Sequence, residues 1–214
     1  FPYSYYTVGS CFAVNASVYV KQGGMNRKQA GEDFYFLHKV FPLGRCYEIN
    51  STCVYPSPRP SDRVPFGTGP MIQSISESTN KDLRTYNFES FIDLKIFLKQ
   101  VHNLYQITGK DLKEFIDNLP KSIAQYLVQH GFFKAVEEIN ANSSNLETFK
   151  KRFFYWYDAF KVLKYLNFAH EHHYEKSSLL IGAENLLEKI SDDSIGQKNC
   201  KEYLEIYRSL EREF

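Results

Sequence analysis

Cysteine is scarce in this sequence, and its few copies form no metal-binding pattern. The 214 residues contain four cysteines, and no two of them stand as a Cys-x-x-Cys pair. The common zinc and redox motifs are thereby excluded. We expect free, mostly buried thiols in a reducing compartment, and a disulfide between Cys46 and Cys53 is the conceivable alternative.

An excess of charge of either sign is also lacking. The 26 Lys and Arg residues are offset by 25 Asp and Glu residues, which leaves a formal net charge of +1. Because nucleic-acid-binding domains usually show a basic excess, nucleic acid is not an expected partner. No apolar run reaches the roughly 18 residues that suggest a membrane-spanning helix. We therefore expect a cytoplasmic protein, with membrane association left open for its full-length form.

Aromatic residues are plentiful, and the periodicity of the apolar residues divides the chain in two. There are 18 Phe and 16 Tyr. Alternating β-branched and aromatic residues predict a strand or a strand-turn pair in 11–20 and another strand pair in 45–55, and a helix is predicted between them from Glu32. The predicted fold class is α+β, mostly α: a partial α/β domain over residues 1–75, followed by an all-helical bundle over residues 86–214.

From residue 86 the chain has helical periodicity throughout. One apolar stripe consists of Phe91, Leu94, Leu98, Val101 and Tyr105. Ser144 and Glu147 have the capping-box spacing, which predicts the start of a long helix that continues to Leu163. The aromatic run 153–160 resembles a stacking platform for bases, but its helical spacing and the missing basic excess favour core packing.

The stretch GGMNRKQAGEDFYFLHKV, residues 23–40, is the best candidate for chemistry. Glu32 and Asp33 stand side by side where a helix is predicted to begin, and a helix N-terminus stabilises an ionised carboxylate. Such a carboxylate can accept a proton from a positioned hydroxyl group. The alternative interpretation is an ordinary helix cap, in which the preceding glycines serve only the turn.

Residues 8–40, VGSCFAVNASVYVKQGGMNRKQAGEDFYFLHKV, resemble the second half of the catalytic domain in family 2 glycosyltransferases, which have the GT-A fold. In that family a strand leads to a Gly-Gly-apolar turn and a variable polar segment. A Gly-Glu-Asp motif then opens an aromatic-rich helix with a basic residue near its end, here Lys39. The resemblance covers about residues 5–70, roughly a third of the chain.

The resemblance implies roles for five residues. Asp33 matches the general base that removes a proton from the acceptor hydroxyl, whose oxygen then attacks the anomeric carbon of a nucleotide sugar with inversion. Glu32 matches the preceding acid, which orients the site or contacts the acceptor. Gly23, Gly24 and Met25 match the turn beside the acceptor pocket.

The resemblance also implies a phosphate-facing loop after this helix. In the segment PSPRPSDRVPFGTG, Arg59 and Arg63 can donate hydrogen bonds to the leaving diphosphate, with Gly67 and Gly69 as hinges of a closing lid. The alternative is a solvated, proline-stiffened loop. Many relatives carry a His near this point, where this sequence has Pro56–Pro58.

The nucleotide-binding half of the family is missing from the sequence. That half carries an Asp-x-Asp motif that holds Mg or Mn against the diphosphate, and this chain contains no Asp-x-Asp. We therefore expect a longer native protein that binds the divalent cation, a nucleotide sugar and a glycan or lipid-linked acceptor. This chain alone carries the base and the acceptor side, and we do not expect it to turn over.

The alternative is a non-catalytic helical interaction module with a vestigial α/β cap. The sequence upstream of residue 1 would distinguish the two hypotheses. In either case the helical domain can bind an acceptor, a partner or a second copy of the chain as a homo-oligomer, and its pattern does not select among them.

Overall fold

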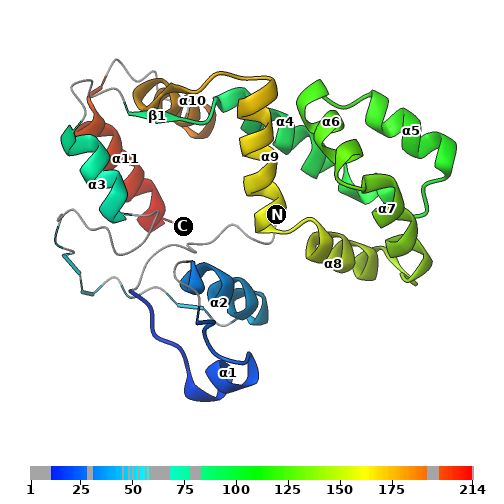
Figure 1. Cartoon of the computed structure of the whole chain (residues 1–214), viewed down its shortest axis with the longest axis horizontal. Coiled ribbons are helices and arrows are strands. Elements are labelled where there is room, and N and C mark those ends of the chain that lie inside the picture. Colours follow the sequence, from blue (N-terminus) through cyan, green and yellow to red (C-terminus); the bar gives the residue numbers. More distant parts are fainter. Residues whose placement is uncertain are drawn as a thin grey trace. The chain divides into compact units, whose positions relative to one another are not determined.

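The structure is a computed structural model in which the chain separates into two compact units, Phe1–Lys81 and Asp82–Phe214. It describes residues 11–27, 31–44, 46–47, 49, 51–52, 54–55, 57, 68–77, 83–191 and 198–213. Most of these residues are helical, and the sheet has two short strands, so the mostly α prediction is confirmed (Figure 1). None of the described helices is long and apolar enough to cross a membrane.

The first unit contains short helices joined by irregular segments. Its elements are α1 (Ala16–Lys21), α2 (Glu32–Val40), the 3-10 helix η1 (Phe41–Leu43) and α3 (Thr68–Glu77). The strand expected over residues 11–20 is wrong, because α1 occupies its second half. The described residues of the strand pair expected over 45–55 are irregular as well, so the α/β part of the prediction is not found among the described residues.

Local capping explains why residues 16–21 are helical. The Asn15 side chain accepts a hydrogen bond from the backbone N–H of Ser17 (2.9 Å), which satisfies one of the free donors at the helix start. Gly23 and Gly24 then end the helix with positive φ angles of 74° and 66°. A strand needs a paired neighbour for its backbone groups, and the described part of this unit contains no strand.

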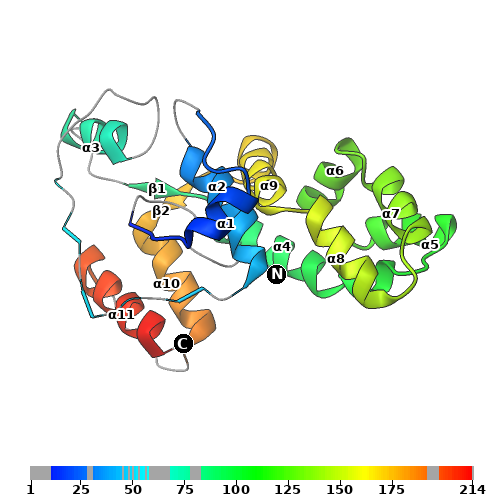
Figure 2. The ribbon, with the colours of Figure 1, turned by 90° about the horizontal axis from the view of Figure 1, so that it is seen from below.

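The second unit is a helical bundle with one small antiparallel ribbon (Figures 1 and 2). The ribbon pairs β1 (Arg84–Thr85) with β2 (Ser177–Ser178), and Arg84 lies opposite Ser178. The remaining elements are α4 (Phe88–Lys99), η2 (Val101–Leu104), α5 (Gly109–Asp117), α6 (Lys121–Gln129), α7 (Phe132–Ala141), α8 (Leu146–Trp156), α9 (Ala159–His172), α10 (Leu179–Ile190) and α11 (Cys200–Glu213).

Aromatic rings form the centre of this bundle. Phe97 of α4 lies with its ring centroid 6.2 Å from Phe132 of α7, 6.1 Å from Phe153 of α8 and 5.2 Å from Tyr157, and all four side chains are fully buried. The pairs are edge-to-face, the arrangement that the ring quadrupole favours. The predicted stripe on α4 is therefore wrong at Phe91, which is 40% exposed while Phe97 is buried.

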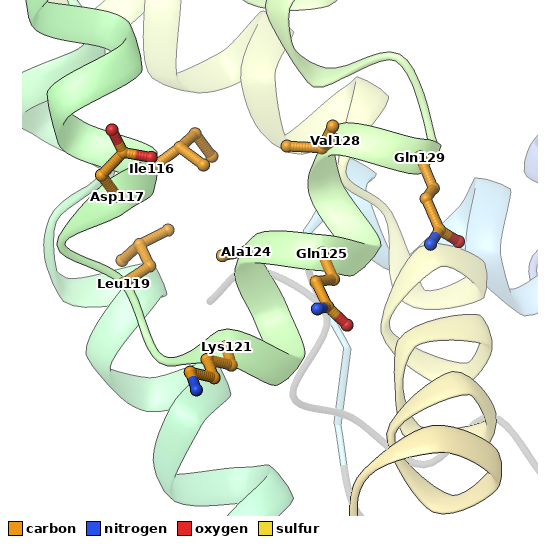
Figure 3. Close-up of a pocket in the computed structure, with 8 residues that line it drawn as sticks. All are labelled: Ile116, Asp117, Leu119, Lys121, Ala124, Gln125, Val128 and Gln129. Carbon is orange, nitrogen blue, oxygen red and sulfur yellow. The ribbon is translucent and has the colours of Figure 1, made fainter.

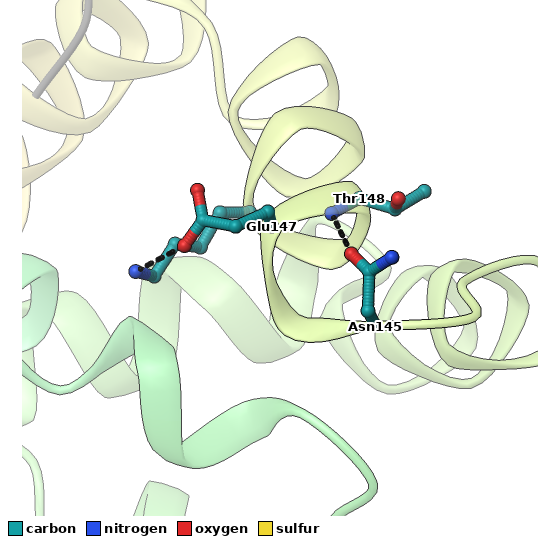
Figure 4. Close-up of polar contacts among 4 residues, drawn as sticks. Asn145, Glu147 and Thr148 are labelled. Carbon is teal, nitrogen blue, oxygen red and sulfur yellow. Dashed lines mark hydrogen bonds and ion pairs between the residues drawn. The ribbon is translucent and has the colours of Figure 1, made fainter.

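The long helix expected from Ser144 to Leu163 is two helices. Asn145, one residue later than predicted, caps α8 by accepting from the Thr148 N–H (2.8 Å), while Glu147 pairs with Lys150 (3.1 Å; Figure 4). The Asp158 side chain then caps α9 by accepting from the Lys161 N–H (2.9 Å). A good capping residue inside an apolar pattern starts a new helix there.

The cysteine expectation is also wrong in part. Cys11, Cys46 and Cys200 are free, as expected, but all three are exposed. Cys53 lies outside the described residues.

A buried carboxylate joins three helices of the bundle. Asp93 of α4 accepts hydrogen bonds on Oδ2 from Ser122 Oγ of α6 (2.5 Å) and from Tyr174 Oη, just beyond α9 (2.7 Å). The Tyr165 hydroxyl of α9 lies 2.8 Å from Ser122 Oγ and 3.1 Å from the Ser90 carbonyl oxygen. Since the single Ser122 proton is used on Asp93, Tyr165 donates its proton to Ser122 or to Ser90.

This polar centre shifts the ionisation of its tyrosines. Burial, helped by the hydrogen bond to Asp93 and its negative charge, raises the pKa of Tyr174 to about 12. Burial likewise raises the pKa of Tyr165, and the nearby charge of Asp93 adds to that effect. The hydroxyl groups therefore remain protonated donors at neutral pH, as the network requires.

We predict that Asp93→Ala lowers the free energy of unfolding by about 2–4 kcal/mol, because it leaves two hydroxyl groups without their acceptor. Asp93→Asn, which keeps one acceptor oxygen, loses less. The exposed Asp117 on α5 is the matched control, and Asp117→Ala changes stability by about 0.5 kcal/mol or less. Urea unfolding measures all three, and equal effects of the two alanine variants would contradict a stabilising role for the network.

Candidate functional site

The start of α2 is set by the backbone of Gly31. This residue adopts φ 77° and ψ 11°, the left-handed conformation that glycine accepts without the steric cost of a Cβ atom. Helix α2 begins directly after it. Glu32 and Asp33 therefore occupy the first turn, where the sequence predicts them.

The two acids lie where backbone N–H groups and the helix dipole favour negative charge. Both side chains are half-buried. Asp33 Oδ1 accepts a hydrogen bond from the backbone N–H of Phe34 at 2.7 Å. This arrangement suits a cap and equally suits a carboxylate held in one orientation for a ligand.

The Gly-Gly-Met turn closes the end of α1. The Gly23 N–H donates to the Val20 carbonyl (3.0 Å), and the Gly24 N–H donates to the Tyr19 carbonyl (2.9 Å). The Met25 N–H donates to the hydroxyl oxygen of Tyr19 at 3.2 Å. Hydrogen bonds to both the backbone and the side chain of Tyr19 therefore fix the turn.

Tyr19 also connects the turn to α2, which lies beside α1 in both views (Figures 1 and 2). Its ring centroid lies 5.2 Å from that of Phe36, the most buried residue of α2. Phe12 packs on Phe36 from the preceding segment, with 6.2 Å between the centroids. The structure therefore brings the Gly23–Met25 turn and the helix that carries the acids into one packed cluster.

Sequence analysis did not identify Tyr19 or Phe12 as parts of this cluster. Both fall in the segment that was expected to be a strand, where alternate side chains point to opposite faces. The available signal was Asn15, which caps α1 and so places Tyr19 on a helix.

The arginines proposed for phosphate binding lie outside the described residues. This applies to Arg59, Arg63, Gly67 and Pro58. Gly69, expected as a hinge in the same loop, lies in the first turn of α3, so the last residues of the predicted loop are helical. Pro70 is compatible with this position because the first turn of a helix does not use its N–H groups.

The described residues do not assemble a metal site. Within them, no three His, Cys, Asp or Glu side chains are grouped as ligands. They therefore do not fit the Mg or Mn that the family resemblance implies.

A shallow hollow of about 480 Å³ lies on α5 and α6 of the second unit (Figure 3). Its walls are Ile116, Leu119, Ala124 and Val128, with Asp117, Lys121, Gln125 and Gln129 as polar groups. None of the residues predicted from the sequence to bind substrate lines it. The hollow has no buried charge and no convergent set of reactive groups, so it adds nothing to the candidate site.

Comparisons with protein-family models, with curated proteins and with solved structures find no match to this chain. Function is therefore inferred from the geometry around α2 and from the motif resemblance of residues 5–70.

We predict that Gly24→Ala destabilises the first unit more than Gly23→Ala does. Both positions have positive φ, so an alanine at either costs about 1 kcal/mol. A Cβ atom at Gly24 would lie 3.0 Å from the Tyr19 ring, whereas one at Gly23 would meet nothing within 4 Å. Displacing the ring adds about 1 kcal/mol or more.

Thermal unfolding of the two variants, followed by tyrosine fluorescence, measures the difference. Equal losses of stability in the two variants would mean that the Tyr19 ring moves aside without cost and does not hold the turn against α2.

Proposed function

We propose that the first unit carries the general base and the acceptor side of an inverting glycosyltransferase. One observation supports this most strongly: the left-handed Gly31 places Glu32 and Asp33 in the first turn of α2. Helix α2 is in turn packed, through Phe36 and Tyr19, against the Gly-Gly-Met turn. A carboxylate held in one orientation within reach of a bound hydroxyl group can take its proton, and the glycines of the turn are proposed to let the backbone approach the acceptor closely.

In the proposed reaction Asp33 takes the proton from the acceptor hydroxyl group. The acceptor oxygen forms a bond to the anomeric carbon of the nucleotide sugar while the bond from that carbon to the diphosphate oxygen breaks. The electron pair leaves with the nucleoside diphosphate, and the configuration at the anomeric carbon inverts. The contribution of the base depends on its position, because proton transfer requires hydrogen-bond distance.

The neighbouring residues have proposed roles in binding. Glu32 points away from Asp33 because adjacent residues on a helix differ by about 100°, and it is proposed to orient the site or to contact the acceptor. Gly23, Gly24 and Met25 form the turn beside the acceptor. Arg59 and Arg63 are proposed to neutralise the leaving diphosphate through paired N–H donors.

The proposed partners are a nucleotide sugar and a glycan or lipid-linked acceptor. Because the described residues do not fit a divalent cation, Mg or Mn and the donor platform are assigned to another segment of the full-length protein. Its location in the cytoplasm, with or without membrane association, belongs to the same proposal.

The helical unit has a surface suited to self-association. On one side of helix α10 the helical period places three large apolar side chains that are 39–53% exposed: Leu179, Leu186 and Ile190. Exposed apolar groups on one helix are a common feature of protein interfaces. A homo-oligomer through this unit, or a purely non-catalytic interaction role for the chain, would use such a surface.

The test is Asp33→Asn in the native-length protein, assayed with a panel of uridine diphosphate sugars and guanosine diphosphate mannose. We expect transfer to fall about 10²–10⁴-fold, the range associated with loss of a general base. The matched control is Asp111→Asn, which changes the same group in the first turn of α5. Transfer that survives Asp33→Asn, with the control also active, would remove Asp33 as the base.

A further inference from the structure

Helix α8 exposes an aromatic residue between two cations. Phe149 and Phe153 bury one face of this helix, but Tyr155 is 84% exposed. Lys151 and Arg152, also exposed, precede Tyr155 by four and three residues. Each spacing makes the cation a neighbour of Tyr155 on the helix surface, with about 5–6 Å between their Cβ atoms, and the two cations lie on either side of Tyr155. The expectation that residues 153–160 are all core packing is therefore wrong at Tyr155.

The cations on this face are not neutralised. Between residues 146 and 165 the chain has five Lys or Arg and two acids. Both acids are already engaged, since Glu147 pairs with Lys150 (3.1 Å) and Asp158 caps α9. Within the part of the chain that the structure describes, neither Lys151 nor Arg152 forms an ion pair. A nearly neutral protein thus has a locally positive face with an open ring at its centre.

The ring of the neighbouring Trp156 is covered by a cation, unlike that of Tyr155. The Nζ atom of Lys161 lies over the Trp156 ring, 4.9 Å from its centroid. This cation–π contact covers the half-buried indole, which packs on Phe132 and Phe153 of the core. Tyr155 is therefore the ring of this segment whose surface is open to a ligand. We call Lys151, Arg152 and Tyr155 the α8 basic-aromatic face.

The chemistry of this face selects among anionic ligands. A membrane surface would favour several exposed apolar side chains and four to eight cations, whereas this face has one open ring that carries a hydroxyl group. Nucleic acid requires a broader basic footprint than this chain has. A sugar ring presents C–H groups that pack on an aromatic face, and a carboxylate pairs with Arg in a bidentate manner.

A uronic acid combines both groups in one residue. Its carboxylate is attached directly to the sugar ring. When that sugar ring stacks on Tyr155, the carboxylate lies a few ångströms away, which is about the distance from Tyr155 to Lys151 and Arg152 on the helix surface. A phosphodiester lies between sugars and would fall farther from the stacked ring. We propose that the α8 basic-aromatic face binds a uronate-bearing glycan, with Tyr155 stacked on a sugar and Lys151 and Arg152 paired with its carboxylates.

The test is isothermal titration of the full chain with a hyaluronan oligosaccharide, which contains uronate, and with a neutral dextran oligosaccharide of the same length. We expect binding of hyaluronan, little binding of dextran, and weaker binding at higher salt. Tyr155→Ala and the pair Lys151→Gln with Arg152→Gln each weaken binding about tenfold or more. Tyr155→Phe keeps the ring and keeps binding.

Matched controls separate this face from general charge and aromatic content. Lys110→Gln with Lys113→Gln makes the same charge change on exposed positions of α5, and Tyr55→Ala removes a tyrosine that is 88% exposed. Neither change alters binding if the inference is right. All substituted side chains are exposed, so unchanged thermal unfolding verifies that the variants fold.

Several outcomes would overturn the inference. These are no binding by the unmodified chain, equal binding of dextran, equal losses in the controls, and a preference for single-stranded oligothymidine or phosphatidylglycerol vesicles over hyaluronan. The assay contains no nucleotide sugar, so its result is independent of the proposed transferase function.

Discussion

Burial of aromatic rings is the interaction on which both units depend. In the first unit Phe36 receives Tyr19 and Phe12, and this contact holds α2 against α1. In the second unit Phe97 gathers rings from α7 and α8. Each fully buried side chain of this size stabilises the fold by about 1.5–3 kcal/mol. These contacts position the helices that carry the acids, α2 with Asp33 and α4 with Asp93.

The acidic residues of the two units lie in different environments. Asp93 is enclosed and its acceptor capacity is used by hydroxyl groups of the same core, which is the behaviour of a structural carboxylate. Glu32 and Asp33 stand half-buried at a helix start behind a left-handed glycine. This position keeps a carboxylate oriented without enclosing it, which is why the proposed chemistry is assigned to the first unit. The open ring of Tyr155 and its cations give the second unit a separate binding role.

Local patterns in the sequence predicted the helical character of the second unit, but they missed α1 and the break between α8 and α9. The start of α2 was predictable because Gly31, Glu32 and the apolar spacing after them act within one or two turns. Residues 16–21 have the alternating pattern of a strand. They form a helix because Asn15 caps its start and the described part of the first unit offers no strand to pair with. Sequence patterns do not identify Asp93 as a buried residue, because the groups that donate hydrogen bonds to it come from α6 and the end of α9. Contacts between distant segments, such as Tyr19 with Phe36, have no periodic signal. The roles of Arg59 and Arg63 remain predictions.

In the proposed reaction the acceptor oxygen displaces the diphosphate directly at the anomeric carbon, with Asp33 as the base. Direct displacement fixes the configuration of the product, which can be measured. The native-length protein is incubated with each nucleotide sugar of the panel and a mixture of glycan acceptors, and nuclear magnetic resonance follows the anomeric proton. We predict release of one nucleoside diphosphate for each sugar transferred and a product whose anomeric configuration is opposite to that of the donor. A product with retained configuration, or no nucleoside diphosphate released from any donor of the panel, would overturn the proposed reaction.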